Sequence, residues 1–164
     1  VQARLADAYR TDFPRARSEV GERDPLFDGA AEVIAALRQR PDLTLGIATG
    51  KSRRGVARLL AQESWEGHFA TIQTADTHPS KPHPSMIETA MRETGIGPEA
   101  TVMVGDTTFD MEMARNAGVG AIGVVWGYHP VERLRTSGAH AIVEAWGALP
   151  KAIAECLSRP GPPA

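Results

Sequence analysis

The stretch Thr101-Val-Met-Val-Gly-Asp-Thr-Thr-Phe-Asp110 joins a short apolar run to a glycine and then to two carboxylates four residues apart. The residues after it, from Met111 to Gly118, have the pattern of a helix. A buried strand that ends in an acidic loop is the usual layout of an active site in an α/β protein. We therefore place Asp106 in the loop and Asp110 in the first turn of the helix, where the helix dipole favours negative charge.

Two carboxylates at one edge of a sheet repel each other unless a cation lies between them or one of them takes up a proton. Oxygen ligands of this kind suit Mg²⁺, which binds few protein carboxylates and completes its shell with water and phosphate. We therefore predict Mg²⁺ as the cofactor, with Asp106 and Asp110 as its candidate ligands. The alternative is that one aspartate caps the helix and the other is only solvated.

The bulk properties of the 164 residues are those of an ordinary globular protein: 42% are apolar, 23% are charged and the formal net charge is −2. This balance argues against nucleic acid and anionic membranes as partners. No apolar run approaches the ~20 residues that a membrane span needs. The single cysteine, Cys156, fits a reducing compartment, so we expect a cytoplasmic protein. The chain starts at Val1 rather than at methionine, which is consistent with a fragment of a longer protein.

Apolar runs of strand length alternate with helical patterns from residue 30 onward. Each strand reads as a continuous apolar run, which is typical of a parallel sheet covered by helices on both faces. The expected fold class is therefore α/β. The expected strands are 43–48, 70–75, a run from Val102, 121–126 and 141–143, and the expected helices are 30–40, 53–62, 84–94, a run from Met111, 131–136 and 149–157.

Thr49 ends an expected strand and is followed by Gly50 and a helix. A hydroxyl and backbone N–H groups in this position can donate to an anion, so the segment is a candidate phosphate site; a simple helix cap is the alternative. Lys81 lies in the proline-rich segment 79–84, where Pro82 favours an extended lysine. A lysine held in this way presents a fixed positive charge to a phosphate; the alternative is a solvated loop lysine.

Three other patterns are weaker. Residues 118–123 match G-x-G-x-x-G but follow a helix and precede a strand, the reverse of a dinucleotide fingerprint, so we interpret them as a helix end and a tight turn. The segment 50–52 lacks the earlier glycine of a P-loop. His78 and His83 are five residues apart in a proline-rich loop, which is not a typical zinc-ligand spacing.

The order of these motifs resembles the haloacid dehalogenase-like (HAD) phosphatases. Strand-Thr49-Gly-Lys, then Lys81-Pro-x-Pro, then Gly-Asp106-x-x-x-Asp110 match the second, third and fourth motifs of that family over about residues 25–157. Gly127-Tyr128 after a strand, with the segment 138–144, resembles the phosphoglycolate phosphatase branch. The resemblance implies a three-layer Rossmann-like core with a mostly parallel sheet.

The resemblance also implies a mechanism, in which an aspartate attacks phosphorus and water hydrolyses the resulting aspartyl-phosphate. In it, Asp106 would bind Mg²⁺ directly, and Asp110 would hold metal-bound water or Lys81. Thr49 and the Gly50 amide would bind the phosphoryl oxygens, and Lys81 would neutralise charge. The implied partner is a small phosphorylated metabolite.

The sequence departs from the family in one respect: the first motif, D-x-D-x-T, occurs nowhere in the 164 residues. We interpret residues 1–24 as a remnant of a helical cap, 25–158 as the hydrolase core and 159–164 as a disordered tail. The strand that carries the nucleophile in the family lies between the strands at 43 and 102. We therefore expect the chain alone to be inactive, and to be unstable, to re-pair its strands or to self-associate through the gap.

Two competing functions stay open. The chain can be the C-terminal portion of a Mg²⁺-dependent phosphatase, or a non-catalytic domain that binds phosphate or metal. A receiver-like signalling domain also uses acidic residues, a threonine and a lysine. Its acidic pair should come early in the chain, however, whereas Asp106 follows Thr49 and Lys81 here.

Overall fold

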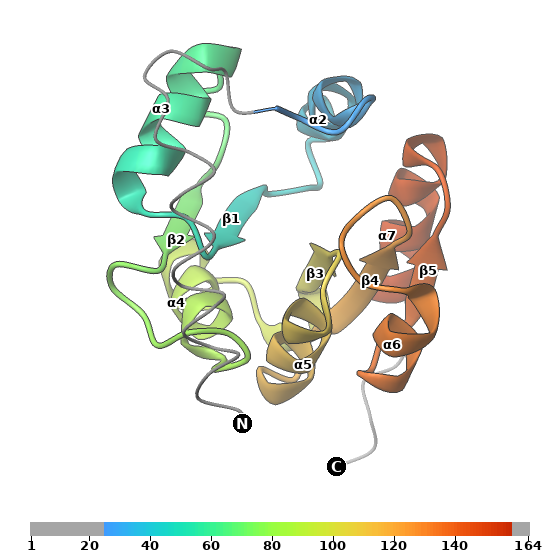
Figure 1. Ribbon diagram of the computed structural model, residues 1–164. Helices are drawn as coiled ribbons and strands as arrows, with labels where there is room; N and C mark the ends of the chain where they lie inside the picture. The colour runs from blue at the N-terminus through green and yellow to red at the C-terminus, as the bar shows by residue number, and fades with distance from the viewer. Residues whose placement is uncertain (1–24, 159–164) are drawn as a thin grey trace.

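The computed structural model describes residues 25–158 as an alternation of short strands and helices (Figure 1). The predicted cap remnant, 1–24, and the predicted disordered tail, 159–164, lie outside the described residues. The elements run in the order α2 (Ala30–Arg38), β1 (Gly46–Thr49), α3 (Arg53–Glu63), β2 (Thr71–Thr74), α4 (Ser85–Thr94), the 3₁₀ helix η1 (Pro98–Ala100), β3 (Val102–Gly105), α5 (Thr108–Asn116), β4 (Gly120–Val124), α6 (Val131–Thr136), β5 (Ala141–Val143), the 3₁₀ helix η2 (Trp146–Ala148) and α7 (Leu149–Leu157).

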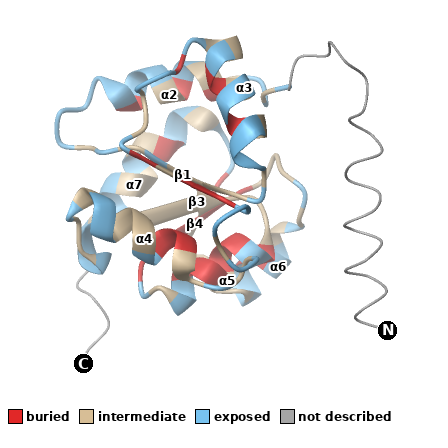
Figure 2. Ribbon diagram, turned by 90° about the vertical axis from the view of Figure 1, so that its left-hand side faces the viewer, coloured by how far each residue is buried: buried red, intermediate tan, exposed pale blue. Residues whose placement is uncertain are grey.

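All strand pairs are parallel, which confirms the predicted α/β class. The strands form two sheets rather than one: β1 pairs with β2, and β3, β4 and β5 pair in that order. In Figure 2 the strands lie between two layers of helices, with α2, α3 and α7 on one side and α4, α5 and α6 on the other. This is the three-layer arrangement that the family resemblance implies.

The two sheets are separated between β1 and β3, which lie apart without pairing (Figure 1). Hydrogen-bonding groups alternate between the two edges of a parallel strand. Because Leu45 O accepts from Ala70 N on the β2 side, Gly46 and Ala48 direct their backbone groups to the open edge of β1. By the same rule, Thr101 O accepts from Gly120 N on the β4 side. Val102 and Val104 therefore direct their backbone groups to the open edge of β3.

Burial changes across the sheets in the way that this separation predicts. In β4, the central strand of its sheet, residues 121–124 are all buried. In β3, which borders the open space, every residue is only half-buried. The outer strand β2 is also more buried than β1. The least covered strands are therefore the two that would be central in a continuous sheet.

Shared hydrophobic clusters hold the two sheets in one body. Below the strands, Ala48 of β1 and Met103 of β3 pack against the cluster that contains Met111 of α5. Above them, Leu45 and Val104 pack against a second cluster formed by residues of α2, α7, β4 and β5. The hydrophobic cores on both sides of the sheets are therefore continuous across the space between β1 and β3, although no strand pairing crosses it.

Most predicted elements are confirmed within one or two residues, and two bounds were wrong. The predicted strand 43–48 begins only at Gly46, because Leu43 N–H bonds back to Arg40 O in a turn after α2. The predicted helix from Met111 begins three residues earlier, at Thr108, because Thr107 caps it. None of the helices within residues 25–158 is both long enough and apolar enough to cross a membrane.

Candidate active site

Thr49 is the last residue of β1, and its side chain organises the turn that follows. Its Oγ1 accepts a hydrogen bond from Lys51 N–H at 3.2 Å. The hydroxyl hydrogen of Thr49 therefore remains able to donate. Gly50 is exposed, and no backbone hydrogen bond from its N–H is found within residues 25–158. These two donors are the predicted phosphate ligands.

The first turn of α3, in contrast, is already capped. Ser52 Oγ accepts from Gly55 N–H at 3.2 Å, and the carboxylate of Asp76 accepts from Arg53 N–H. The sequence predicted that free N–H groups of this helix would bind an anion. The side chains of Ser52 and Asp76 already satisfy two donors of this turn, so these two N–H groups are not available to an anion.

Lys81 joins the two sheets at their carboxyl ends. Its Nζ donates to Ala48 O, one residue before Thr49, at 3.0 Å, and to Asp110 Oδ1 of α5 at 2.6 Å. The Lys81 side chain is 18% exposed and that of Asp110 only 6%, so this ion pair is largely shielded from water. The peptide bond from Lys81 to Pro82 is cis. The sequence predicted a fixed lysine here, and the structure holds its ammonium group beside Thr49.

Asp110 lies in the first turn of α5, as predicted, and takes part in a capping box. Its Oδ2 accepts from Thr107 N–H at 3.1 Å and from Thr107 Oγ1 at 2.8 Å, and its own N–H donates to Thr107 Oγ1. A Cβ on Gly105 would overlap the Asp110 side chain, so this close approach requires glycine. Both oxygens of Asp110 therefore have partners, and the residue is better suited to orienting Lys81 than to binding a metal.

Asp106 follows β3 directly and is fixed by the loop after β4. Its Oδ2 accepts from Tyr128 N–H at 2.9 Å, and its backbone carbonyl accepts from His129 N–H at 3.2 Å. A Cβ on Gly127 would overlap the Asp106 side chain, so a glycine is needed here too. No hydrogen bond to Asp106 Oδ1 is found within the described part of the chain, which leaves this oxygen for a ligand.

His129 lies in the loop after β4, where the sequence indicates that it could line a pocket but favours a simply exposed histidine. Its Nδ1 accepts a hydrogen bond from Thr108 N–H at 3.0 Å, so it caps α5 beside Asp106. Its ring also packs against Phe109, with 5.9 Å between ring centroids. The exposed ring of Tyr128 contacts Phe27 in the same way, at 6.5 Å. A rim of aromatic side chains thus lies next to the predicted metal-binding carboxylate.

Within residues 25–158, no three His, Cys, Asp or Glu side chains converge as a ready metal site. The donor set that is present fits Mg²⁺ only in part: Asp106 supplies one oxygen without a protein partner, and Asp110 supplies none. Mg²⁺ accepts such a site because it binds one or two carboxylates together with water and phosphate oxygens.

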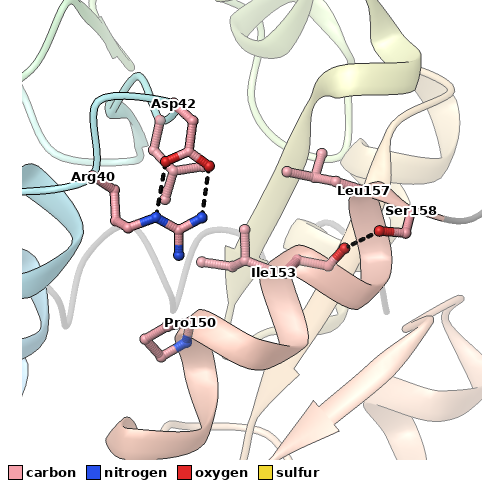
Figure 3. A pocket seen from close by; sticks show the side chains of 8 residues that line it. Arg40, Asp42, Pro150, Ile153, Leu157 and Ser158 are labelled. Atoms are coloured by element: carbon pink, nitrogen blue, oxygen red, sulfur yellow. Dashed lines mark hydrogen bonds and ion pairs between the residues drawn. The ribbon is translucent and has the colours of Figure 1, made fainter.

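A separate pocket of about 220 Å³ lies on another part of the molecule (Figure 3). It is formed between the segment after α2, with Arg40 and Asp42, and α7, with Ile153 and Leu157. The Arg40 guanidinium binds both oxygens of Asp42, and its hydrogen bond lowers the pKa of that carboxyl. None of the predicted site residues lines this pocket, so it is distinct from the candidate active site.

Fold, motifs and comparison agree on the class of protein. A family model for the haloacid dehalogenase-like hydrolases matches residues 5–124, and the chain belongs to this family. The resemblance drawn from Thr49, Lys81 and Asp106 is thereby confirmed at the level of the family.

Particular relatives are phosphatases by name. A protein named "Probable phosphatase IndB" from Dickeya dadantii is 38% identical over 123 residues, which is 74% of this chain and 53% of that protein. The phosphoglycolate phosphatase of Synechococcus elongatus is 30% identical over 146 residues, 87% of this chain and 68% of the relative. The phosphoglycolate phosphatase of Escherichia coli K12 is 31% identical, with 81% and 53% covered. The chain thus spans between 53% and 68% of the length of these relatives.

Solved structures agree with this assignment. The crystal structure of a predicted phosphatase from Clostridium acetobutylicum superposes with a TM-score of 0.70 at 27% identity, over 79% of this chain and 60% of that one. A haloacid dehalogenase-like protein of unknown function from Agrobacterium tumefaciens shares the fold with a TM-score of 0.70 at 21% identity, over 94% and 70%.

Proposed function

We propose that this chain is the phosphate-binding and charge-compensating part of a Mg²⁺-dependent phosphatase that acts on small phosphorylated metabolites. The observation that carries the proposal is the position of Lys81, whose ammonium group bridges the end of β1 to Asp110 of α5. Lys81 lies 33 positions after Ala48 and 29 positions before Asp110, and its ammonium group joins both at one edge of the fold. Phosphoryl transfer depends on this kind of positioning and charge compensation.

Each predicted site residue has a role in this proposal. The Thr49 hydroxyl and the Gly50 amide donate to phosphoryl oxygens, and the Lys81 ammonium offsets their negative charge. Asp110 orients Lys81, while Asp106 offers Oδ1 to Mg²⁺. When bound, Mg²⁺ would supply further charge neutralisation at the phosphate. In line with the family resemblance, the phosphoryl group passes through an aspartyl-phosphate whose aspartate comes from a D-x-D-x-T strand.

The open edges of β1 and β3 support the docking of that strand. Gly46 and Ala48 on one side, and Val102 and Val104 on the other, direct backbone groups into the space between the sheets. A parallel strand placed there would satisfy both edges and would end beside Lys81 and the carboxyl ends of its neighbours. Where no such strand is supplied, we expect a second copy of the chain to pair with the open edges.

A non-catalytic domain that binds phosphate or metal is the second candidate function. It is supported by the chemistry of the described site, in which Thr49 Oγ1 and the Lys81 ammonium group can bind an anion and Asp106 Oδ1 can bind a cation without a covalent step. In either case we place the protein in the cytoplasm, in agreement with its lone cysteine.

The two candidates are separated by turnover measurements on a panel of phosphorylated metabolites, beginning with phosphoglycolate, with and without Mg²⁺. The short chain is compared with a version extended at its N-terminus by a D-x-D-x-T strand. A matched extension with both aspartates replaced by asparagine is the control. We expect Mg²⁺-dependent turnover only from the intact extension. Robust turnover by the short chain would contradict the proposal, and equal inactivity of all three would favour the binding domain.

A further inference from the structure

A chain of polar side chains runs from α4 through β2 to the loop that carries Lys81. Glu93 Oε2 accepts hydrogen bonds from Thr71 Oγ1 at 2.5 Å and from Gln73 Nε2 at 2.8 Å. Gln73 Oε1 lies 2.8 Å from His78 Nε2. His78 Nδ1 lies 2.7 Å from Ser85 Oγ. The candidate phosphate-binding residues do not belong to this series of hydrogen-bonded side chains. The ion pair between Lys81 and Asp110 is not part of it either.

The chemistry of Glu93 fixes the direction of the hydrogen bonds. A carboxylate only accepts, so the amide of Gln73 must turn its NH₂ group towards Glu93 and its oxygen towards His78. That oxygen can only accept, and therefore His78 carries a hydrogen on Nε2. In the neutral ring, Nδ1 then accepts from the Ser85 hydroxyl. Gln73 is 4% exposed, so its partners cannot easily be replaced by water.

His78 closes the loop across its base. The loop leaves β2 at Thr74 and enters α4 at Ser85. One ring nitrogen of His78 bonds to Gln73 in the strand, and the other bonds to the first residue of the helix. Lys81 lies within the segment that is closed in this way. Its neighbour Pro82 is held from the other side, because Pro82 O accepts from Asn116 Nδ2 at 3.0 Å.

We propose that His78 is a positioning residue for phosphate binding. Through Gln73 and Ser85 it holds the loop so that the Lys81 ammonium stays beside Thr49. This inference rests on the proposed function, in which Lys81 binds phosphate. It adds a residue that touches neither phosphate nor metal and acts only through Lys81.

The test is a titration of the 164-residue chain with inorganic phosphate in the presence of Mg²⁺, followed by NMR. Lys81→Ala should weaken phosphate binding roughly tenfold or more, because it removes a charged donor. His78→Phe keeps a ring but loses both hydrogen bonds, and it should weaken binding about threefold to tenfold through misplacement of Lys81. Thr77→Ala is the loop control, since Thr77 is exposed and makes no side-chain hydrogen bond within residues 25–158; it should stay within about twofold of wild type.

The double variant distinguishes positioning from a general structural effect. Where His78 acts through Lys81, His78→Phe weakens phosphate binding in the wild-type chain and has no further effect in Lys81→Ala. An equal loss in both backgrounds would overturn the inference, and so would a His78→Phe affinity equal to that of Thr77→Ala. If His78→Phe does not fold, Ser85→Ala takes its place in the same cycle, with the same two outcomes.

The failure of the proposed function gives a different result. In that case Lys81→Ala and wild type bind phosphate equally, whatever the effect of His78. A second measurement does not depend on phosphate at all: long-range ¹H–¹⁵N spectra should show His78 with its hydrogen on Nε2. A hydrogen on Nδ1 alone would contradict the arrangement from which the inference is drawn.

Discussion

Replacing Lys81 by methionine should destabilise the protein strongly, although the residue lies in a loop. The Lys81 and Asp110 side chains are 18% and 6% exposed, and 2.6 Å separates Nζ from Oδ1. Removing one partner of a buried ion pair leaves an uncompensated charge, which typically costs about 3–5 kcal/mol. Asp110 keeps its two hydrogen bonds from Thr107, so we expect the lower end, about 3 kcal/mol. In a chain of this length that corresponds to roughly 6–12 °C in Tm.

The assay is urea unfolding followed by circular dichroism, with Lys151→Met as the matched control. Lys151 also pairs with a carboxylate, Glu155, but the distance is 3.6 Å and the side chains are 81% and 65% exposed. Its replacement should change the free energy of unfolding by less than about 0.5 kcal/mol. Adding Asp110→Asn to Lys81→Met should restore about 1–2 kcal/mol, since the unpaired charge is removed. If Lys81→Met is as mild as Lys151→Met, the reasoning about this ion pair is wrong.

Two further substitutions test the site and its surroundings. Gly127→Ala should cost about 1–3 kcal/mol, because the new Cβ would overlap Asp106 and force the loop to move; urea unfolding measures this. Glu93→Gln should lower Tm at neutral pH, since hydrogen bonds from Thr71 and Gln73 hold the pKa of Glu93 below its ordinary value of 4.5. A lowered folded-state pKa stabilises the protein above pH 4.5 and loses its effect as pH falls through the folded value, so the Tm difference should shrink in acid.

Each of these substitutions has a control in the chain. Gly147→Ala introduces a Cβ with no atom within 4 Å, so it should leave stability nearly unchanged; an equal cost at Gly127 and Gly147 would refute the overlap. Glu88→Gln changes another exposed glutamate of α4, and its Tm difference from wild type should stay small at every pH. A Glu93→Gln difference that persists unchanged in acid would contradict the assigned hydrogen bonds.

The fold was largely predictable because each element is decided by nearby residues. The runs 102–104 and 121–124 are apolar and of strand length, and the helix patterns between them are amphipathic. The predicted ends of an element were wrong where a side chain or a turn sets the boundary. At Thr107, for example, a capping box lets α5 begin earlier than the spacing of apolar residues indicates. The space between β1 and β3 was expected only from the family resemblance, since no local pattern marks an unpaired edge.

The candidate site was predictable in its residue types but not in its contacts. Thr49 ends β1, Lys81 lies in the loop after β2 and Asp106 directly follows β3, and the carboxyl ends of parallel strands meet at one edge. The roles of His78 and His129 were not visible, because their partners depend on the fold: a glutamine and a serine for His78, and a helix N–H 21 positions away for His129. A histidine in a loop has no sequence pattern that reports such partners.

The central claim is that Thr49, Lys81 and Asp106 hold a phosphorylated compound beside a divalent ion. A crystal structure of the chain with phosphate and Mn²⁺, an oxygen-seeking ion with usable anomalous scattering, tests it directly. We predict phosphate within hydrogen-bond distance of Thr49 Oγ1, Gly50 N and Lys81 Nζ, with the anomalous peak beside Asp106 Oδ1. Phosphate bound elsewhere on the surface, with no metal at Asp106, would contradict the account.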